Sequence, residues 1–483
     1  MLTIFLFLNL FLHVIAFAWM KVEHNLYIFR LAVISLTIAL ASSIYDTLIF
    51  GFGFGYGFSG GFALTLFNDC LRINQAILAQ ESLLLLIALI LLITYRDFKF
   101  KPEFYLILFT NLISATYLLE SYNFIIFFIS WELFNLSLYI LIVANGVQKQ
   151  EALSASLKYF LLSAFSTAFL LLGIAMIYHI TGSLEFQSIY IAMSAVPGLP
   201  GKGPTGGGGF HDIDFPVIFI IFALLFKMGA APLHYWAPDL YDTTKLPIAA
   251  YISNIPKLLY ILLALNLVDF LECQNYFFII AGFLSIIIGS LGLFQQFKIR
   301  RFLAFSAIAN LGYFLIIIQY SGLVLYNVVI YMIPVLNIFV ILIYLNSLYE
   351  KDFDSFDSLK GLFKINPFLA FSFIISLFSI AGIPPLPGFF AKYLLLSKAF
   401  MVFNPSLFAI IIIMTVIAVA NYLRLAYLIL FANPRYSLPI LKLDGNLFSQ
   451  PTFVILVLNF KLIALFTYMD MMSFIFSYIG YSI

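Results

Sequence analysis

The chain has 483 residues, of which 64% are hydrophobic and 10% charged, and its mean hydropathy is +1.08. Soluble domains carry about 25% charged residues, so this chain has too few charges to cover a soluble surface. Its formal net charge of +2 is too small to indicate nucleic-acid binding. The composition therefore predicts an all-α polytopic membrane protein whose outer surface contacts lipid.

Two cysteines and five histidines limit the chemistry of the chain. An iron–sulfur cluster usually needs four thiolates, and the sequence has no C-x-x-C pair for zinc. We therefore expect no redox centre, no cofactor and no metal in this chain. The first apolar run lacks a basic start and a small-residue cleavage site, so we expect a retained membrane helix rather than a signal peptide.

Apolar segments of about 20 residues, the length that spans a bilayer, alternate with clusters of charge, proline and glycine. The sequence predicts fourteen membrane helices, at 2–19, 27–50, 80–95, 103–119, 122–145, 152–180, 215–239, 247–268, 275–296, 302–320, 322–348, 367–400, 405–431 and 451–479. With the N-terminus outside, fourteen Lys and Arg residues fall in inner loops, and only Arg72 and Lys202 in outer ones. This asymmetry predicts both termini outside.

Two predicted outer loops are rich in glycine, and each contains a formal G-x-G-x-x-G pattern, within Gly51 to Gly61 and Pro197 to Gly209. A dinucleotide site would need a strand before the pattern and a helix after it. Neither is predicted, so we interpret both loops as connectors.

Several charged residues lie inside predicted helices. Arg30, Lys398 and Arg424 lie near enough to helix ends for their head groups to reach the interface. Lys461 and Asp470 in the last predicted helix are interpreted as a local structural pair.

Glu132 lies ten residues into its predicted helix, about 15 Å deep and near the middle of a ~30 Å hydrocarbon core. Lys227 and Lys257 lie at similar depth, whereas Lys158 is shallower. Burial favours a neutral lysine and a nearby carboxylate favours a charged one. Glu132 opposite Lys227 would therefore form a protonation switch, with Lys257 and Lys392 passing the proton onward. In the alternative interpretation, Glu132 and Lys227 form a static ion pair that fixes packing.

Prolines interrupt two predicted helices, at Pro232 shortly after Lys227 and at Pro384 shortly before Lys392. Unwound backbone at membrane depth is tolerated only inside protein or beside a wet cavity. His234 follows the first interruption and is either a hydrogen-bonding plug or a member of the relay. Paired interruptions predict two repeats, with helices four to eight in one and nine to thirteen in the other. The single membrane domain 1–483 would then divide into 1–102, 103–270, 271–431 and 432–483.

Three blocks of sequence resemble the subunit 2 family of respiratory complex I (NADH:ubiquinone oxidoreductase). They are FKMGAAPLHYWAPDLYDTTKLPIAAYISNIPK, SWEL around Glu132 and AGIPPLPGFFAK before Lys392, in the expected order. The stretch from Trp236 to Tyr241 favours subunit 2 over the related subunits 4 and 5 and over sodium/proton antiporter subunits.

The resemblance implies two inverted five-helix repeats with discontinuous helices 7 and 12. It assigns Glu132 to the helix-five glutamate, Lys227 to the helix-seven lysine, Lys257 to the connecting lysine and Lys392 to the terminal lysine of the second half. It also implies membrane-subunit neighbours, including antiporter-like ones, with flavin, iron–sulfur clusters and quinone in partner subunits. The chain departs from the pattern in helices nine to eleven, where no second mid-membrane acid occurs and Asn310 and Asn337 are the nearest polar candidates.

These features favour a proton-translocating subunit of complex I. A secondary sodium/proton antiporter and a purely structural membrane subunit stay as alternatives. The 57 phenylalanines suggest an AT-rich organellar genome, which favours the mitochondrial inner membrane, with both termini in the intermembrane space, over a bacterial plasma membrane.

Overall fold

The computed structural model describes residues 25–52, 64–66, 70–97, 100–144, 149–189, 214–268, 275–349, 353–433 and 450–467. The predicted first helix 2–19 lies outside these residues, as do Asp470, the stretch 197–209 and residues 53–61.

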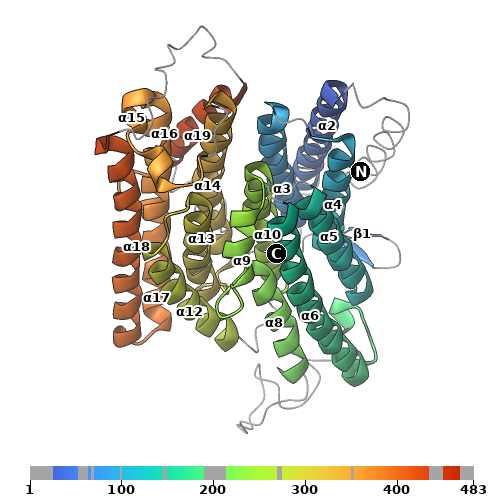
Figure 1. Cartoon of the computed structure of the whole chain (residues 1–483). Coiled ribbons are helices and arrows are strands. Elements are labelled where there is room, and N and C mark those ends of the chain that lie inside the picture. Colours follow the sequence, from blue (N-terminus) through green and yellow to red (C-terminus); the bar gives the residue numbers. More distant parts are fainter. Residues whose placement is uncertain are drawn as a thin grey trace.

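Helices lie side by side across the molecule (Figure 1), and short strands and 3-10 turns occur only between them in the described part. In chain order the elements are α2 (Asn25–Phe52), β1 (Leu64–Leu66), β2 (Leu71–Ile73), α3 (Gln75–Thr94), η2 (Tyr95–Asp97), α4 (Pro102–Glu120), α5 (Phe124–Ala144), α6 (Lys149–Thr181), α8 (Asp214–Met228), α9 (Trp236–Thr243), α10 (Leu246–Asn266), α12 (Asn275–Phe294), α13 (Ile299–Ile316), α14 (Ser321–Tyr349), η4 (Phe356–Leu359), α15 (Leu362–Ile365), α16 (Pro367–Ala381), α17 (Pro387–Val402), α18 (Pro405–Phe431) and α19 (Gln450–Thr467).

Ten helices within the described ranges are long and apolar enough to cross a membrane. Every predicted membrane helix from 27–50 onward corresponds to one described helix or to two half-helices, and the last is described as far as Thr467. The predicted all-α polytopic fold is therefore confirmed.

Helices seven and twelve of the prediction are discontinuous, as expected: α8 and α9 form one, and α16 and α17 the other. The first half of each ends at a glycine in the left-handed region, Gly229 with φ +74° and Gly382 with φ +81°. In each case the amide after the glycine donates to the carbonyl five residues earlier, at 3.0 Å. Left-handed glycines with this bonding end helices, because they satisfy the last free carbonyl groups. Two segments far apart in the chain thus break in the same way.

The two ends of the bundle differ in character. At one end, called here the strand end, β1 pairs with β2, Leu71 bridges Ser121 and Asn123 bridges Glu185. The opposite, charged end carries the ion pairs of the described residues, which join α9, the start of α13 and the segment around η4: Lys298–Asp242, Arg301–Asp239, Arg301–Asp242, Arg300–Asp354 and Lys360–Asp357. The basic residues of this end are those predicted for inner loops, so the strand end corresponds to the predicted outer side.

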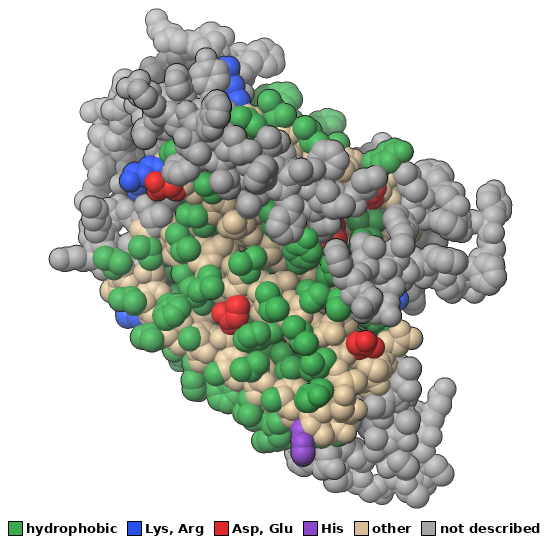
Figure 2. Space-filling view, turned by 90° about the vertical axis from the view of Figure 1, so that its right-hand side faces the viewer, with side chains coloured by type: hydrophobic (Ala, Val, Ile, Leu, Met, Phe, Trp, Pro, Cys, Tyr) green, Lys and Arg blue, Asp and Glu red, His purple; other side chains and the backbone are tan. Residues whose placement is uncertain are grey.

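α10 lies at the centre of the bundle. All of its membrane-crossing length is buried, and it packs against α3, α4, α8 and α14. α5, α6 and α18 instead expose apolar side chains, among them Ile129, Leu161 and Val416. Figure 2 shows one outer face of the molecule, where apolar side chains cover most of the described surface and charged groups are few. Such a face suits lipid or another membrane helix.

Candidate functional site: buried lysines at two helix breaks

Lys227 lies in the last turn of α8 and is 1% exposed. Its Nζ donates to Oδ1 of Asn135 on α5, at 2.7 Å, and to Oγ of Ser163 on α6. The rings of Tyr159 and Trp131 lie 5.4 and 6.0 Å from the same nitrogen. Neutral oxygen atoms and aromatic faces thus hold the ammonium group inside the bundle. Three helices contribute to this pocket.

Glu132 lies on α5, three residues before Asn135, so both side chains project from neighbouring positions on one helix. It is half-buried, and its Oε1 atom is buried with no hydrogen-bond partner. Within the described residues no ion pair joins it to Lys227 at 4.0 Å or less, yet it lies near enough for its charge to act on the lysine. The static contact pair is therefore not formed here, and Asn135 takes the direct bond.

A hydrogen-bonded link leads from the Lys227 pocket to α10. The hydroxyl of Tyr260 on α10 donates to the same Asn135 oxygen, at 3.1 Å. Lys257 lies three residues before Tyr260, on a neighbouring position of the helix surface. One asparagine oxygen therefore contacts both Lys227 and the helix that carries Lys257.

Lys257 is 4% exposed, and its Nζ has no hydrogen-bond partner in the described structure. It lies 5.2 Å from the ring of Tyr241, whose hydroxyl is also buried without a partner. Buried polar groups are normally hydrogen-bonded, and an exception calls for a functional explanation. The Lys257 ammonium and the Tyr241 hydroxyl can therefore each form a hydrogen bond with a group that takes part in proton transfer.

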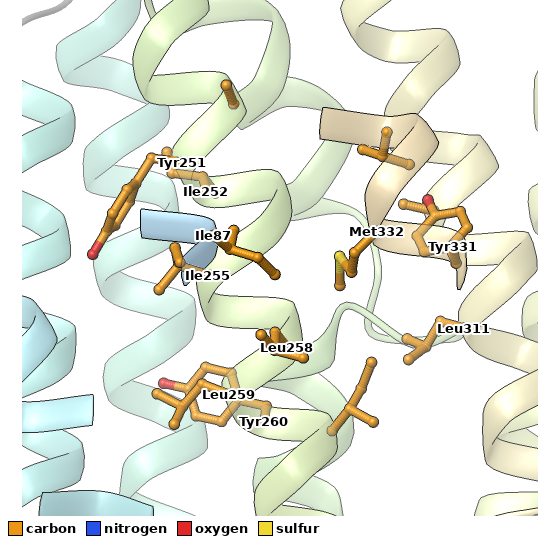
Figure 3. Close-up of a cluster of buried hydrophobic side chains, with 14 of the residues drawn as sticks. Ile87, Tyr251, Ile252, Ile255, Leu258, Leu259, Tyr260, Leu311, Tyr331 and Met332 are labelled. Atoms are coloured by element: carbon orange, nitrogen blue, oxygen red, sulfur yellow. The ribbon is translucent and has the colours of Figure 1, made fainter. Parts of the chain in front are cut away.

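A mainly apolar layer, which also contains the phenol of Tyr331 on α14, lies between this region and the second half of the chain. Figure 3 shows Leu258 of α10 and Met332 of α14 pointing into the space between their helices, with Leu311 of α13 close by. Protons crossing from Lys257 towards the second half would need water or a side-chain movement at this layer.

Lys392 lies on α17, and its Nζ donates to the carbonyl oxygen of Ala381 at 3.0 Å. The ring of Tyr313 lies 6.0 Å from the nitrogen. A Cβ atom on Gly382 would lie 2.8 Å from Cδ of Lys392, so the side chain passes over a position that has to be glycine. The lysine reaches back across the helix break to the last residue of α16.

Lys227 and Lys392 are thus both associated with the C-terminal end of a half-helix, in different ways. Lys227 lies in the last turn of α8 itself. Lys392 lies on α17, the half-helix after the second break, and its Nζ bonds back to the end of α16. The C-terminal end of a helix carries a partial negative charge that stabilises a cation. Each helix break therefore supplies a charge-stabilising end inside the membrane, and each end has one lysine.

The other predicted site residues are placed less uniformly. Pro232 and Pro384 lie in the two breaks and are exposed. His234 is 4% exposed, stacks on Tyr235 with the ring centroids 4.4 Å apart, and has a buried Nδ1 without a hydrogen-bond partner. Lys158 is exposed on α6, while the next residue, Tyr159, faces Lys227. The structure therefore brings Lys158 into no contact with the buried lysines.

Asn310 and Asn337, the polar candidates of the second half, both make hydrogen bonds. Asn337 on α14 donates to Ser376 on α16 at 2.7 Å and to Asn459 on α19 at 2.9 Å. Asn310 donates to the carbonyl oxygen of Ser306 at 2.8 Å. The hydrogen bond between Asn337 and Asn459 thus joins α19 to the second half of the chain.

Two buried acids, Glu81 on α3 and Glu120 at the end of α4, were missed by sequence reasoning. Glu81 was counted near the start of a predicted helix and Glu120 in the connection between two. The signal for Glu81 is an acid next to the unbroken LLLLIALILLI run. The signal for Glu120 is an acid at the end of a helix that only three residues separate from the next one.

The broken helices, each with a lysine at its break, define an antiporter-like membrane transport subunit. Residues 121–418 match the family described as NADH:quinone oxidoreductase/Mrp antiporter, TM, and the chain belongs to this family.

Several relatives carry the names of NADH oxidoreductase subunits. NADH-ubiquinone oxidoreductase chain 2 of Rhizopus oryzae is 33% identical over 347 residues, covering 68% of this chain and 64% of the relative. The chain 2 protein of Oenothera berteroana is 32% identical over 344 residues, 69% and 68% of the two chains. NADH-quinone oxidoreductase subunit N of Hydrogenovibrio crunogenus is 29% identical over 410 residues, 83% and 82%. The predicted resemblance is confirmed.

Solved structures share the fold. A chain of respiratory complex I from Thermus thermophilus superposes with a TM-score of 0.78 at 22% identity, covering 98% of both chains. A chain of the Mrp complex from Dietzia sp. DQ12-45-1b gives a TM-score of 0.78 at 17% identity, covering 99% of this chain and 96% of that one.

Proposed function

We propose that this chain is the subunit 2 type of antiporter-like subunit in the membrane arm of an NADH:ubiquinone oxidoreductase, where it translocates protons. Membership of the family and the names of the relatives support this assignment. The redox chemistry would take place in partner subunits that hold flavin, iron–sulfur clusters and quinone, and this chain would hold no cofactor. Its neighbours would be other membrane subunits of the complex, some of them antiporter-like.

The observation that best supports proton transport is the setting of Lys227. Its buried ammonium is held by an asparagine and a serine, and no carboxylate of the described residues forms an ion pair with it. Its charge is therefore free to respond when Glu132 moves or is neutralised. In this mechanism the proton leaves Lys227 and reaches Lys257 through water. Asn135 Oδ1, which accepts hydrogen bonds from both Lys227 and Tyr260, holds these two groups in place and does not carry the proton itself. The proton then crosses the apolar layer to Lys392.

Location and orientation belong to the same proposal. The composition favours the mitochondrial inner membrane, with the charged end in the matrix and both termini on the intermembrane-space side. A bacterial plasma membrane is the alternative, since subunit N proteins of bacteria are also relatives.

Replacing Glu132 with glutamine tests the mechanism. The Glu132→Gln variant keeps the side-chain size but removes the charge that acts on Lys227, so protons moved per NADH oxidised should fall more than the amount of assembled complex. Proton uptake by membrane vesicles and NADH oxidation would be measured on the same preparation. Glu103→Gln, at the start of α4, is the control. An unchanged ratio in Glu132→Gln would exclude this glutamate from the relay.

A sodium/proton antiporter would behave differently. The purified chain, placed in vesicles under a sodium gradient, should then move protons without NADH. We expect no such transport, because the proposed relay is driven by quinone reduction in partner subunits.

A further inference from the structure

The carboxyl groups of Glu81 and Glu120 meet between α3 and α4, on the side of the bundle where α2, α3 and α4 lie together (Figure 1). Glu81 is fully buried and Glu120 is 2% exposed. The backbone fixes this meeting, because Leu71, just before α3, bridges Ser121, just after α4, and Tyr122 donates to the carbonyl oxygen of Cys70 at 3.0 Å.

Neither carboxyl group forms an ion pair with a Lys, Arg or His side chain of the described residues. Both oxygen atoms of Glu81 and Oε2 of Glu120 are buried, and none of them has a hydrogen-bond partner among the described residues. Among the described residues, the other ionisable groups that face the pair are Asp46, from α2, and Tyr117, from α4. In this part of the chain the pair therefore lies among acids and a phenol, while the charge of the N-terminal ammonium also acts on both carboxyl groups.

We propose that Glu81 and Glu120 form a proton-binding site that exchanges protons between the first half of the chain and the strand end. Two carboxylates within hydrogen-bonding reach, away from water, cannot both stay ionised, so one proton shared between them joins the two groups. A divalent cation would need about six or more oxygen ligands, and the described residues contain no group of three or more His, Cys, Asp or Glu that could hold one. A proton is the ligand that two oxygen-only groups can bind.

The surroundings of the pair connect it to the proposed relay. Gln80, next to Glu81, exchanges two amide hydrogen bonds with Asn266, at 2.9 and 3.0 Å. Asn266 is the last residue of α10, nine residues beyond Lys257, which corresponds to about 14 Å along the helix. On the other side, Asp46 is only half-buried. The pair thus lies between the helix of Lys257 and a partly accessible carboxylate near the strand end.

The test uses Glu81→Gln and Glu120→Gln in the intact complex, with two readouts. A glutamine amide can donate to the remaining carboxylate, so either variant keeps a bond between α3 and α4 while removing the shared proton. Infrared spectroscopy with hydrogen–deuterium exchange should show the loss of one protonated-carboxyl band in each variant. Protons moved per NADH oxidised should fall, while Glu185→Gln, an exposed acid at the strand end, should change neither readout.

The proposal rests on the proposed proton transport for its role, but the infrared band does not. Loss of the band with normal pumping would overturn the exchange role and reduce the shared proton to a packing contact. An unchanged band in both variants would overturn the site itself. A sodium-dependent shift of the band would replace the proton with a monovalent cation. If Lys227→Met also left pumping unchanged, the proposed function would fail, while the band would still decide the proton-binding site.

Discussion

Lys227→Met should abolish most of the proton transport that passes through this subunit. Methionine fills the lysine volume with an unbranched apolar chain, so the pocket stays packed while Asn135 and Ser163 lose their donor. A positioned proton-transfer group typically contributes a factor of about 10² to 10⁴, which is why we expect this variant to have the largest effect on transport. Protons moved per NADH oxidised, measured in vesicles at equal amounts of assembled complex, checks the expectation.

Lys158→Met is the matched control, because it removes a lysine from the same half of the chain at an exposed position on α6. It should leave the proton ratio unchanged. If the charges only pin helices together, the opposite pattern is expected: Lys227→Met would lower the amount of complex, and the complexes that form would pump normally. That result would favour the structural alternative for the whole set of buried lysines.

Much of the fold could be predicted from the sequence because lipid leaves few alternatives. Every backbone group must be bonded within a helix, so long apolar segments mark the helices directly. The breaks were predictable from clusters of glycine and proline, Gly229 with Pro232 and Gly382 with Pro384, because such clusters remove helical hydrogen bonds at membrane depth. A single proline does not break a helix here, since Pro256 and Pro334 lie inside α10 and α14. The glycines that end α8 and α16 follow from the need for a left-handed residue there.

The partners of the buried charges could not be predicted. Sequence reasoning paired Glu132 with Lys227 because opposite charges attract. In the structure Lys227 instead donates a hydrogen bond to Asn135, three residues further along α5. The direction of these side chains depends on how α5, α6 and α8 pack. The bond from Lys392 back to Ala381 likewise depends on the path of the chain through the second break. Helix count and order carry no information about these contacts.

The direction of the Lys158 side chain could not be predicted either. It shares a helix with Ser163 and Tyr159, which both face Lys227, yet its own side chain points outward. On a helix, adjacent residues face about 100° apart, and the sequence of α6 is too uniformly apolar to show which face is buried. In a soluble protein, the contrast between the apolar and the polar face of a surface helix shows which side is buried. This contrast is absent when lipid replaces water on the outside.

Gly388→Ala should prevent the second helix break from forming, and with it the placement of Lys392. A Cβ atom at this position would lie 1.8 Å from the carbonyl oxygen of Ser379, which belongs to α16. Overpacking against side chains typically costs about 1–3 kcal/mol, and here the obstacle is backbone that cannot rotate away, so the cost should reach or exceed the upper end. Because α17 carries Lys392, moving α17 away from α16 would also break the hydrogen bond from Lys392 to Ala381.

The amount of folded subunit in the membrane and the proton ratio of any complex that forms should both fall. Ser397→Ala, at an exposed position of the same helix, should change neither. Normal levels of a fully active Gly388→Ala complex would show that close contact between these half-helices is not required to position the lysine.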